Sequence, residues 1–337
     1  MAIKKGFDTD KYIGLQKKEV LRRAARFDRL YLEFGGHLCY DGHASRVLPG
    51  YRPQVKIELL KRIKDLEIIY CVSARDLNTK KRLGDFKLDY KKQTLHDLSE
   101  LRKEGLRVLA ICITRYSGEK HAKEFGKVLA GKYSVYFSPE TKDYLKGASY
   151  AYKGYSKYPF IPVKSKIVVV TGAAGGSGKM ACAMSQIYHE IKAGKNAGYA
   201  KFETFPIWNL PLDHPINIAY EAATADLGDF LRYDPYHLRA YGIRAVNYNR
   251  DIQNFAILIK IARLVTKQKD AFGYKSPTDM GINMEKKAII NDTVCRQAAL
   301  EEIKRRWKLY NSEYEAGRES PKTIVRMKEI MKKANLL

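Results

Sequence analysis

Short apolar, β-branched runs alternate with amphipathic stretches along most of the chain. The runs predict strands, and the stretches, whose apolar residues recur every three or four positions, predict helices. We expect strands at 30–34, 66–72, 106–114, 133–137, 167–170, 200–205 and 245–248. We expect helices at 12–27, 55–63, 91–103, 120–129, 179–191, 216–225 and 250–265. Strands that alternate with helices in this way are typical of a parallel sheet covered by helices.

The alternation changes character at two places. Residues 139–165 are rich in Tyr, Gly and Pro, which predicts a long surface connection. After Gly281 the pattern predicts helices only, at 293–314 and 321–333. The chain is therefore divided into an α/β unit at 1–138, the connection at 139–165, a second α/β unit at 166–275 and a basic helical segment at 276–337. The predicted fold class is α/β, with a three-layer, P-loop or Rossmann-like core around a parallel sheet and a helical C-terminal extension.

A glycine-rich turn follows the strand at 167–170 and leads into the helix at 179–191. Glycines allow consecutive backbone N–H groups to point at one anion, the helix N-terminus adds partial positive charge, and a lysine can reach terminal phosphates. A turn needed for packing alone would explain the glycines but not the lysine. The residues predicted to bind phosphate are Gly172, Gly175, Gly176, Ser177, Gly178 and Lys179. The prediction requires an open turn whose lysine is not held in an internal ion pair.

The turn departs from the P-loop pattern at two positions. Ala173 stands where that pattern has its first glycine, and Met180 stands where a Ser or Thr would hold Mg²⁺. A thioether is a poor ligand for Mg²⁺, so Ser177, Thr171 or a carboxylate elsewhere would have to replace that contact, or no metal is held here. Phosphate binding is therefore better supported than triphosphate hydrolysis. The glycine spacing also allows a dinucleotide or phosphometabolite, with Glu203 as the candidate ribose ligand.

Polar residues follow several of the other predicted strands, and ligands of open parallel sheets bind beyond the carboxyl ends of the strands. Arg115 and Arg250 are candidates to neutralise phosphate charge, because a guanidinium binds two oxygens at once. Surface salt bridges or helix caps are the alternative for both. Glu203 and Asp226 are candidates to position a metal or a water. These four residues form the predicted catalytic set of a phosphoryl-transferring or hydrolytic enzyme.

Two patterns bear on metal binding. His37, Asp41 and His43 have the spacing of metal ligands on a loop. Histidines near Asp are also common in loops that bind no metal, so the presence of a metal is left open. His-Glu at 189–190 suggests the HExxH motif of zinc proteases. Ala193 occupies the position of the second histidine, so a zinc protease is not expected.

Composition restricts the setting in which the protein works. The chain has 337 residues, a formal net charge of +25 and 45% hydrophobic residues, which indicates a folded basic protein. No apolar run approaches the roughly 20 residues that span a bilayer. The start resembles no secretory signal, and the five scattered cysteines indicate reduced thiols. We therefore expect a cytoplasmic protein without a membrane partner, and leave a homo-oligomer open.

The predicted ligand is a small phosphorylated molecule, with a nucleoside phosphate such as ATP as cofactor and Mg²⁺ as an open addition. The positive charge is spread along the chain, so it would attract nucleic acid only weakly and without sequence specificity. The last-ranked alternative is an RNA- or polyanion-binding protein. Its bases would stack on the tyrosines of the connection, Tyr150, Tyr152, Tyr155 and Tyr158.

Several runs of residues occur together in an order that is similar to a known family. They are YLEFGG at 31–36, HASRVLPG at 43–50, ITRYSG at 113–118, GSGK at 176–179, KFETFPIWN at 201–209, VNYNRD at 246–251 and SPTDMG at 276–281. From near its start to about Arg306, the chain resembles an uncharacterised bacterial family known as a domain of unknown function, some members of which carry the label ATP-dependent zinc protease. The resemblance implies an α/β, nucleotide-binding-like core and no established reaction. Family members tend to be longer, and most have a lysine in place of His37, which weakens a metal role for it.

Overall fold

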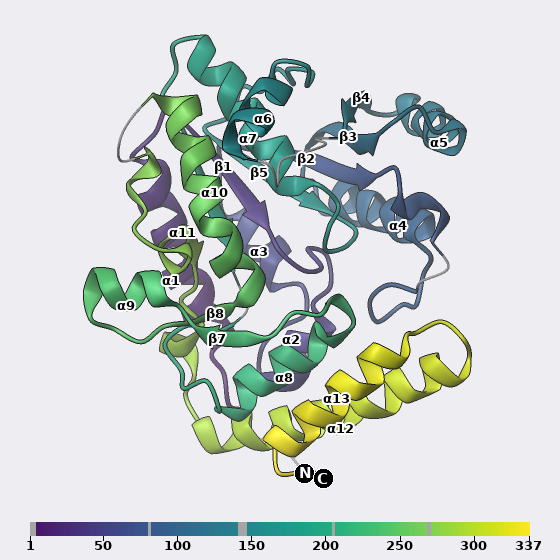
Figure 1. Ribbon diagram of the computed structural model, residues 1–337, viewed down its shortest axis with the longest axis vertical. Coiled ribbons are helices and arrows are strands. Elements are labelled where there is room, and N and C mark those ends of the chain that lie inside the picture. Colours follow the sequence, from purple (N-terminus) through teal and green to yellow (C-terminus); the bar gives the residue numbers. More distant parts are fainter. Residues whose placement is uncertain (1–4, 80–81, 141–146, 204–205, 268–270) are drawn as a thin grey trace.

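The computed structural model describes residues 5–79, 82–140, 147–203, 206–267 and 271–337. Seven parallel strands form the main sheet within this described part (Figure 1). Side by side they are β4 (Ser134–Pro139), β3 (Val108–Tyr116), β2 (Leu66–Ser73), β5 (Ile167–Gly172), β1 (Arg29–Phe34), β6 (Ala197–Phe202) and β9 (Gly281–Ile282). The run Ile-Val-Val-Val at the start of β5 is buried throughout. Such a run suits a central parallel strand with both faces covered.

Helices cover both faces of this sheet. The connections from β1 to β2, β3 and β4 all run in one direction and contain α3 (Val55–Lys61), α4 (Tyr90–Lys103) and α5 (Lys120–Ala130). Those from β5 to β6 and β9 run the opposite way and contain α7 (Lys179–Lys192), α10 (Asn249–Thr266) and α11 (Pro277–Met280). Right-handed crossovers place the two groups on opposite faces, and in Figure 1 α10 lies in front of the sheet and α3 behind it. α1 (Thr9–Ala24) packs on β1, β9 and α3.

The reversal of direction occurs between the neighbouring strands β1 and β5. This is a topological switch point, where open α/β sheets form a crevice beyond the carboxyl ends of their strands. The glycine-rich turn follows β5 and therefore lies at that crevice. The fold thus puts the predicted phosphate site where this architecture binds ligands.

A helical layer lies beyond the carboxyl edge of the sheet, at the bottom of Figure 1. α12 (Asp292–Glu315) packs on α13 (Pro321–Lys333), α8 (Pro215–Ala223) and α2 (Gly42–Val47). Asn291 caps α12 and Ser320 caps α13, and Pro321 occupies the first position of α13. Caps of this kind satisfy backbone N–H groups that have no partner inside the helix.

The α/β class, the parallel sheet and the two C-terminal helices are confirmed. The strand expected at 245–248 forms as β8 (Val246–Tyr248), but it pairs antiparallel with β7 (Leu231–Tyr233) in a separate two-stranded sheet. Part of the strand expected at 200–205 lies outside the described residues. Within those residues no helix is both long and apolar enough to cross a membrane.

Part of the connection expected at 139–165 is helical in the described residues. α6 (Ala148–Tyr155) forms there and packs on α10 and α7. Tyr155 and Tyr158 are 3% and 5% exposed, whereas Tyr150 is exposed. Buried rings cannot stack on bases, so Tyr155 and Tyr158 cannot belong to the predicted ladder for nucleic acid.

Candidate functional site

The glycine-rich turn, residues 173–178, joins β5 to α7 in a conformation that needs its glycines. Gly176 and Gly178 have φ values of +78° and +80°, in the left-handed region that favours glycine. A Cβ on Gly178 would lie 2.6 Å from Oγ1 of Thr114, and one on Gly172 would lie 2.5 Å from the backbone oxygen of Cys71. The backbone of the turn therefore packs directly against β3, and the end of β5 just before it packs against β2.

The same turn presents hydrogen-bond donors that the protein does not use. The backbone N–H groups of Gly175, Gly176 and Gly178 donate no hydrogen bond within the described part of the chain. Gly175 is exposed, and Gly176 and Gly178 are partly exposed. The first N–H groups of α7 add further donors, because a helix N-terminus leaves them without intrahelical partners. Donors arranged in this way are suited to an anion.

Lys179 brings a positive charge into the turn. Its side chain is buried, and Nζ lies 3.1 Å from the backbone oxygen of Ala174 and 3.4 Å from Oγ of Ser177. No carboxylate of the described residues forms an ion pair with it. Burial lowers the pKa of Lys179, and the nearby carboxylate of Glu33 opposes that shift. The ammonium thus contacts neutral oxygens, which phosphate oxygens can replace.

Arg115 lies beside the turn, at the carboxyl end of β3. Its terminal nitrogens are 3.9 Å from the position that a Cβ on Gly176 would occupy. Its φ of +52° is uncommon for a residue other than glycine. Strained backbone of this kind tends to occur at functional sites, and the geometry puts this guanidinium within reach of an anion bound in the turn.

The other predicted catalytic arginine is engaged elsewhere. Nε of Arg250 lies 2.9 Å from Oδ1 of Asp229, and Nη2 bonds the second oxygen of the same carboxylate. Asp226, in the 3₁₀ helix η3 (Ala225–Leu227), accepts a hydrogen bond of 3.0 Å from Oη of Tyr310 on α12. Asp226 therefore links η3 to α12, whereas Arg250, although paired with Asp229, lies near enough to Lys179 to add to the lowering of its pKa by burial.

Glu203 belongs to a carboxylate cluster that consists of Glu33, Lys201, Glu203 and Asp251. Glu33 on β1 lies in register with Lys201 on β6, and Glu203 follows two residues later on the same face. Nζ of Lys201 is 2.5 Å from Oδ1 of Asp251 and 4.0 Å from Oε1 of Glu203. Oη of Tyr199 donates a hydrogen bond of 2.7 Å to Glu33. β1, β6 and α10 thus bring three carboxylates and one ammonium together.

The crevice beside this cluster has free space. A Cβ on Gly35, just after β1, would have no neighbour within 4 Å among the residues that the structure describes. Burial raises the pKa of Glu203 to about 7, with Asp251 and Glu33 adding to the shift and Lys201 opposing it. A carboxyl with that pKa can both take up and release a proton near neutral pH. Sequence reasoning missed Glu33, Lys201 and Asp251, although all three lie in runs that marked the family resemblance.

Glu203 is expected to make folding stability depend on pH. Its pKa is about 7 in the folded protein and about 4.3 in an unfolded chain. The resulting stabilisation is full below the unfolded value and is lost as pH rises through the folded one. The melting temperature should therefore fall between about pH 4.5 and 7.5, and Glu203→Gln should flatten that fall. Glu124→Gln, at an exposed position of α5, is the control, and equal slopes in the wild type and Glu203→Gln would contradict the expectation.

The predicted metal ligands have separate partners. Oδ2 of Asp41 lies 2.7 Å from Nζ of Lys56, and Nδ1 of His43 lies 2.8 Å from Oε1 of Glu302. In the part of the chain that the structure describes, no three His, Cys, Asp or Glu side chains are grouped as a metal site requires. The two residues of the incomplete zinc-protease motif also have separate partners: His189 hydrogen-bonds the backbone oxygen of Tyr158, and Glu190 pairs with Arg29.

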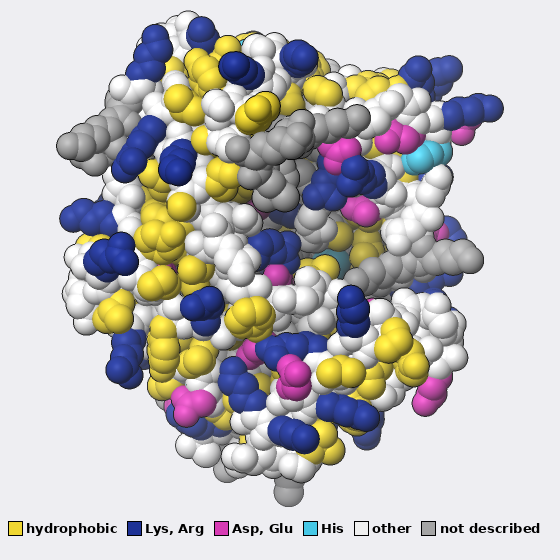
Figure 2. Space-filling view, viewed as in Figure 1, with side chains coloured by type: hydrophobic (Ala, Val, Ile, Leu, Met, Phe, Trp, Pro, Cys, Tyr) yellow, Lys and Arg dark blue, Asp and Glu magenta, His cyan; other side chains and the backbone are white. Residues whose placement is uncertain are grey.

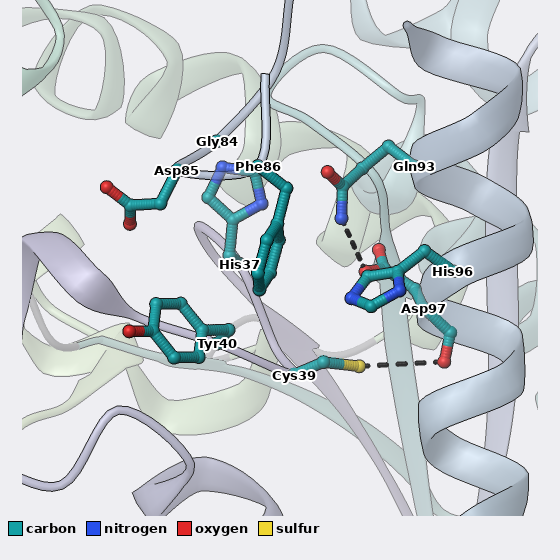
Figure 3. A pocket seen from close by; sticks show the side chains of 9 residues that line it. All are labelled: His37, Cys39, Tyr40, Gly84, Asp85, Phe86, Gln93, His96 and Asp97. Atoms are coloured by element: carbon teal, nitrogen blue, oxygen red, sulfur yellow. Dashed lines mark hydrogen bonds between the residues drawn. The ribbon is translucent and has the colours of Figure 1, made fainter. Parts of the chain in front are cut away.

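His37, in the loop that follows β1, lines a small pocket beside α4 (Figure 3). The other lining residues are Cys39, Tyr40, Gly84, Asp85, Phe86, Gln93, His96 and Asp97. The pocket encloses about 10 Å³, which is the space that one water needs. A phosphorylated ligand does not fit there, so the turn remains the candidate site.

Comparisons with known proteins agree with the resemblance seen in the sequence. A family model described as "Domain of unknown function DUF1846, N-terminal" matches residues 5–335. The chain is 47% identical over 338 residues to a UPF0371 protein of Clostridium tetani (strain Massachusetts / E88), an alignment that covers 99% of this chain and 67% of the relative. It is 45% identical over 335 residues to a UPF0371 protein of Clostridium botulinum (strain ATCC 19397 / Type A), covering 98% and 66%. The chain thus spans about two thirds of the length of these relatives.

Proposed function

The chain belongs to the family of the domain of unknown function DUF1846. Because that description states no reaction, we propose a function from the geometry. The protein binds the phosphate groups of a nucleotide or another phosphorylated ligand at the glycine-rich turn. One observation carries this proposal. The N–H groups of Gly175, Gly176 and Gly178 have no partner in the described residues, and the ammonium of Lys179 lies in the same turn, 3.1 Å from the backbone oxygen of Ala174. Gly175 is exposed and Gly176 and Gly178 are partly exposed, so an anion can reach these donors.

The proposed reaction is the transfer of a phosphoryl group to a hydroxyl or to water. The bond from phosphorus to the leaving oxygen breaks, a bond from phosphorus to the acceptor oxygen forms, and the proton of the acceptor passes to Glu203. Arg115 and Lys179 would stabilise the charge on the transferred group. The pKa of Glu203, at about 7, supports this role.

Mg²⁺ fits the turn poorly. Met180 offers no hard oxygen, and the hydroxyl of Ser177 is buried and already contacts Lys179. This favours a second candidate function, in which the turn holds the phosphate of a metabolite or dinucleotide and no phosphoryl group moves. The two functions differ in a measurable way, since binding without transfer would be indifferent to Mg²⁺.

A ligand panel tests the proposal. ATP, ADP, NAD and a sugar phosphate are compared with adenosine and the free sugar, each with and without Mg²⁺, by thermal shift. We expect at least one phosphorylated compound to raise the melting temperature by several degrees and its unphosphorylated counterpart to leave it unchanged, as binding to the native state requires. If no phosphorylated compound does so, phosphate binding is wrong. Formation of a phosphorylated product or of inorganic phosphate then separates transfer from binding alone.

A further inference from the structure

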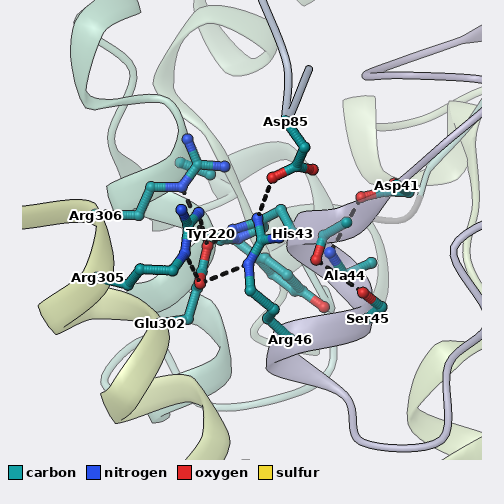
Figure 4. Close-up of polar contacts among 12 residues, drawn as sticks. Asp41, His43, Ala44, Ser45, Arg46, Asp85, Tyr220, Glu302, Arg305 and Arg306 are labelled. Atoms are coloured by element: carbon teal, nitrogen blue, oxygen red, sulfur yellow. Dashed lines mark hydrogen bonds and ion pairs between the residues drawn. The ribbon is translucent and has the colours of Figure 1, made fainter. Parts of the chain in front are cut away.

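A second group of cationic side chains lies where α12 packs on α2 (Figure 4). At its centre is Glu302, whose side chain is 1% exposed. It accepts hydrogen bonds from Nδ1 of His43 at 2.8 Å and from Nε of Arg46 at 2.8 Å. Arg305 donates through Nε and Nη2 at 2.6 and 2.8 Å, and Nε of Arg306 lies 3.2 Å away. One buried carboxylate therefore fixes three guanidinium groups, which we call the arginine cluster (Arg46, Arg305 and Arg306).

The arginine cluster carries more positive than negative charge. Three guanidiniums face two carboxylates, Glu302 and Asp85, whose Oδ1 lies 2.9 Å from Nη2 of Arg46. Burial opposes ionisation of Glu302, but the bonds from Arg305 and His43 outweigh it and hold the pKa of Glu302 well below its usual range. Burial lowers the pKa of His43, so the imidazole adds no full charge at neutral pH. One positive charge is left over.

Donors are left over as well. Both terminal nitrogens of Arg306 and Nη1 of Arg305 make no hydrogen bond within the described part of the chain. The side chain of Arg306 is 18% exposed, so an anion in solution can reach these nitrogens. Guanidiniums bind phosphate oxygens in a forked geometry and tolerate partial burial better than ammonium groups. Unused donors, excess charge and fixed geometry together point to an anion.

The arginine cluster lies across the crevice from the glycine-rich turn. Arg306 is one helical turn before Tyr310, whose hydroxyl bonds Asp226. Leu227, the residue after Asp226, has its Cδ1 atom 3.4 Å from the position that a Cβ on Gly175 would occupy. On the face shown in Figure 2, Lys and Arg side chains lie on both sides of the hollow between the sheet and the helical layer. The arginine cluster is thus linked to the turn through Tyr310 and η3.

We propose that the arginine cluster is a second binding site for a phosphate group, separate from the turn. Glu302 is the positioning residue that orients the three guanidiniums, and the spare N–H groups of Arg305 and Arg306 bind the anion. Together with the proposed function of the turn, on which this last step rests, the site implies a substrate that carries two phosphate groups, or two phosphorylated substrates bound side by side.

The test is the binding of inorganic phosphate, measured by calorimetry at constant ionic strength. Wild type, Lys179→Ala, Arg306→Gln and the double variant are compared. We expect two sites in the wild type, and a loss of about tenfold or more in affinity at one of them in Arg306→Gln. Arg306→Lys, which keeps the charge but not the fork, should fall between. Arg318→Gln is the control, since Arg318 pairs with Glu313 away from the cluster.

The outcomes separate the two sites. Arg306 provides the longest of the contacts to Glu302, so Arg306→Gln should fold, which its melting temperature verifies. Unchanged phosphate binding in Arg306→Gln overturns this proposal. Weak binding that is lost to the same extent in every variant when sodium chloride replaces part of the buffer salt is non-specific, and it overturns the proposal as well. Weaker binding in Arg306→Gln with no effect of Lys179→Ala overturns the proposed role of the turn and leaves the arginine cluster standing. A doubly phosphorylated sugar that binds more tightly than its monophosphate would support one shared ligand.

Discussion

Lys179→Ala is expected to weaken the binding of phosphorylated ligands by about 100-fold, because it removes a charge-assisted hydrogen bond from a partly desolvated site. The ammonium now rests on the backbone oxygen of Ala174 and the hydroxyl of Ser177. A bound phosphate would exchange these neutral contacts for an ionic one. Calorimetry with whichever compound of the panel binds most tightly to the wild type measures the loss.

The matched control for this variant is Lys192→Ala, at the exposed far end of the same helix. It changes the net charge by the same amount, so it should reproduce any effect of general electrostatics and leave the affinity close to that of the wild type. The unliganded Lys179→Ala protein should melt no lower than the wild type, because a buried ammonium is costly. Equal affinities in the Lys179→Ala protein and the wild type would reduce the turn to a packing element.

Glu302→Gln is expected to lower the free energy of unfolding by roughly 3–5 kcal/mol, the range for removal of one partner from a buried ionic network. The substitution keeps the shape of the side chain but leaves the arginine cluster without its central carboxylate, and it turns an amide NH₂ toward cations. Since Glu302 joins α12 to α2, the helical layer should loosen first. Urea denaturation monitored by circular dichroism measures the change.

Glu301→Gln supplies the comparison, one residue earlier on the same helix. The side chain of Glu301 is 71% exposed and pairs only with Lys304 in the described structure, so its loss should cost less than about 1 kcal/mol. The low pKa of Glu302 also determines how its contribution to stability depends on pH. That contribution is present above the pKa of an unfolded glutamate and decreases as pH falls below that value. A Glu302→Gln protein as stable as Glu301→Gln would show that the network contributes nothing to folding.

The order of elements could be predicted because each strand and helix has its own local pattern. β5, the glycine-rich turn and α7 are contiguous, so their spacing alone locates the candidate phosphate site. α6 was missed although Ala148, Ala151 and Tyr155 are its buried residues and have helical spacing, because the tyrosines and glycines around them favoured a loop.

The carboxylate cluster and the arginine cluster could not be predicted in the same way. Glu33 meets Lys201 only because β1 pairs with β6, and no local pattern specifies the order of strands in a sheet. His43 and Glu302 are 259 positions apart in the chain. Tertiary contacts also engage two of the predicted residues, since Arg250 and Asp226 are held by side chains from other parts of the chain, Asp229 and Tyr310.

The position of β1 between β5 and β6 has a consequence for biosynthesis. On a ribosome, β1 emerges early, but both of its hydrogen-bonding neighbours follow more than 130 residues later. The nascent chain must therefore keep an apolar strand unpaired while the intervening residues are translated, and contacts of such long range fold slowly. Until β6 has been synthesised, β1 is an apolar strand with an unpaired hydrogen-bonding edge, which a chaperone could protect.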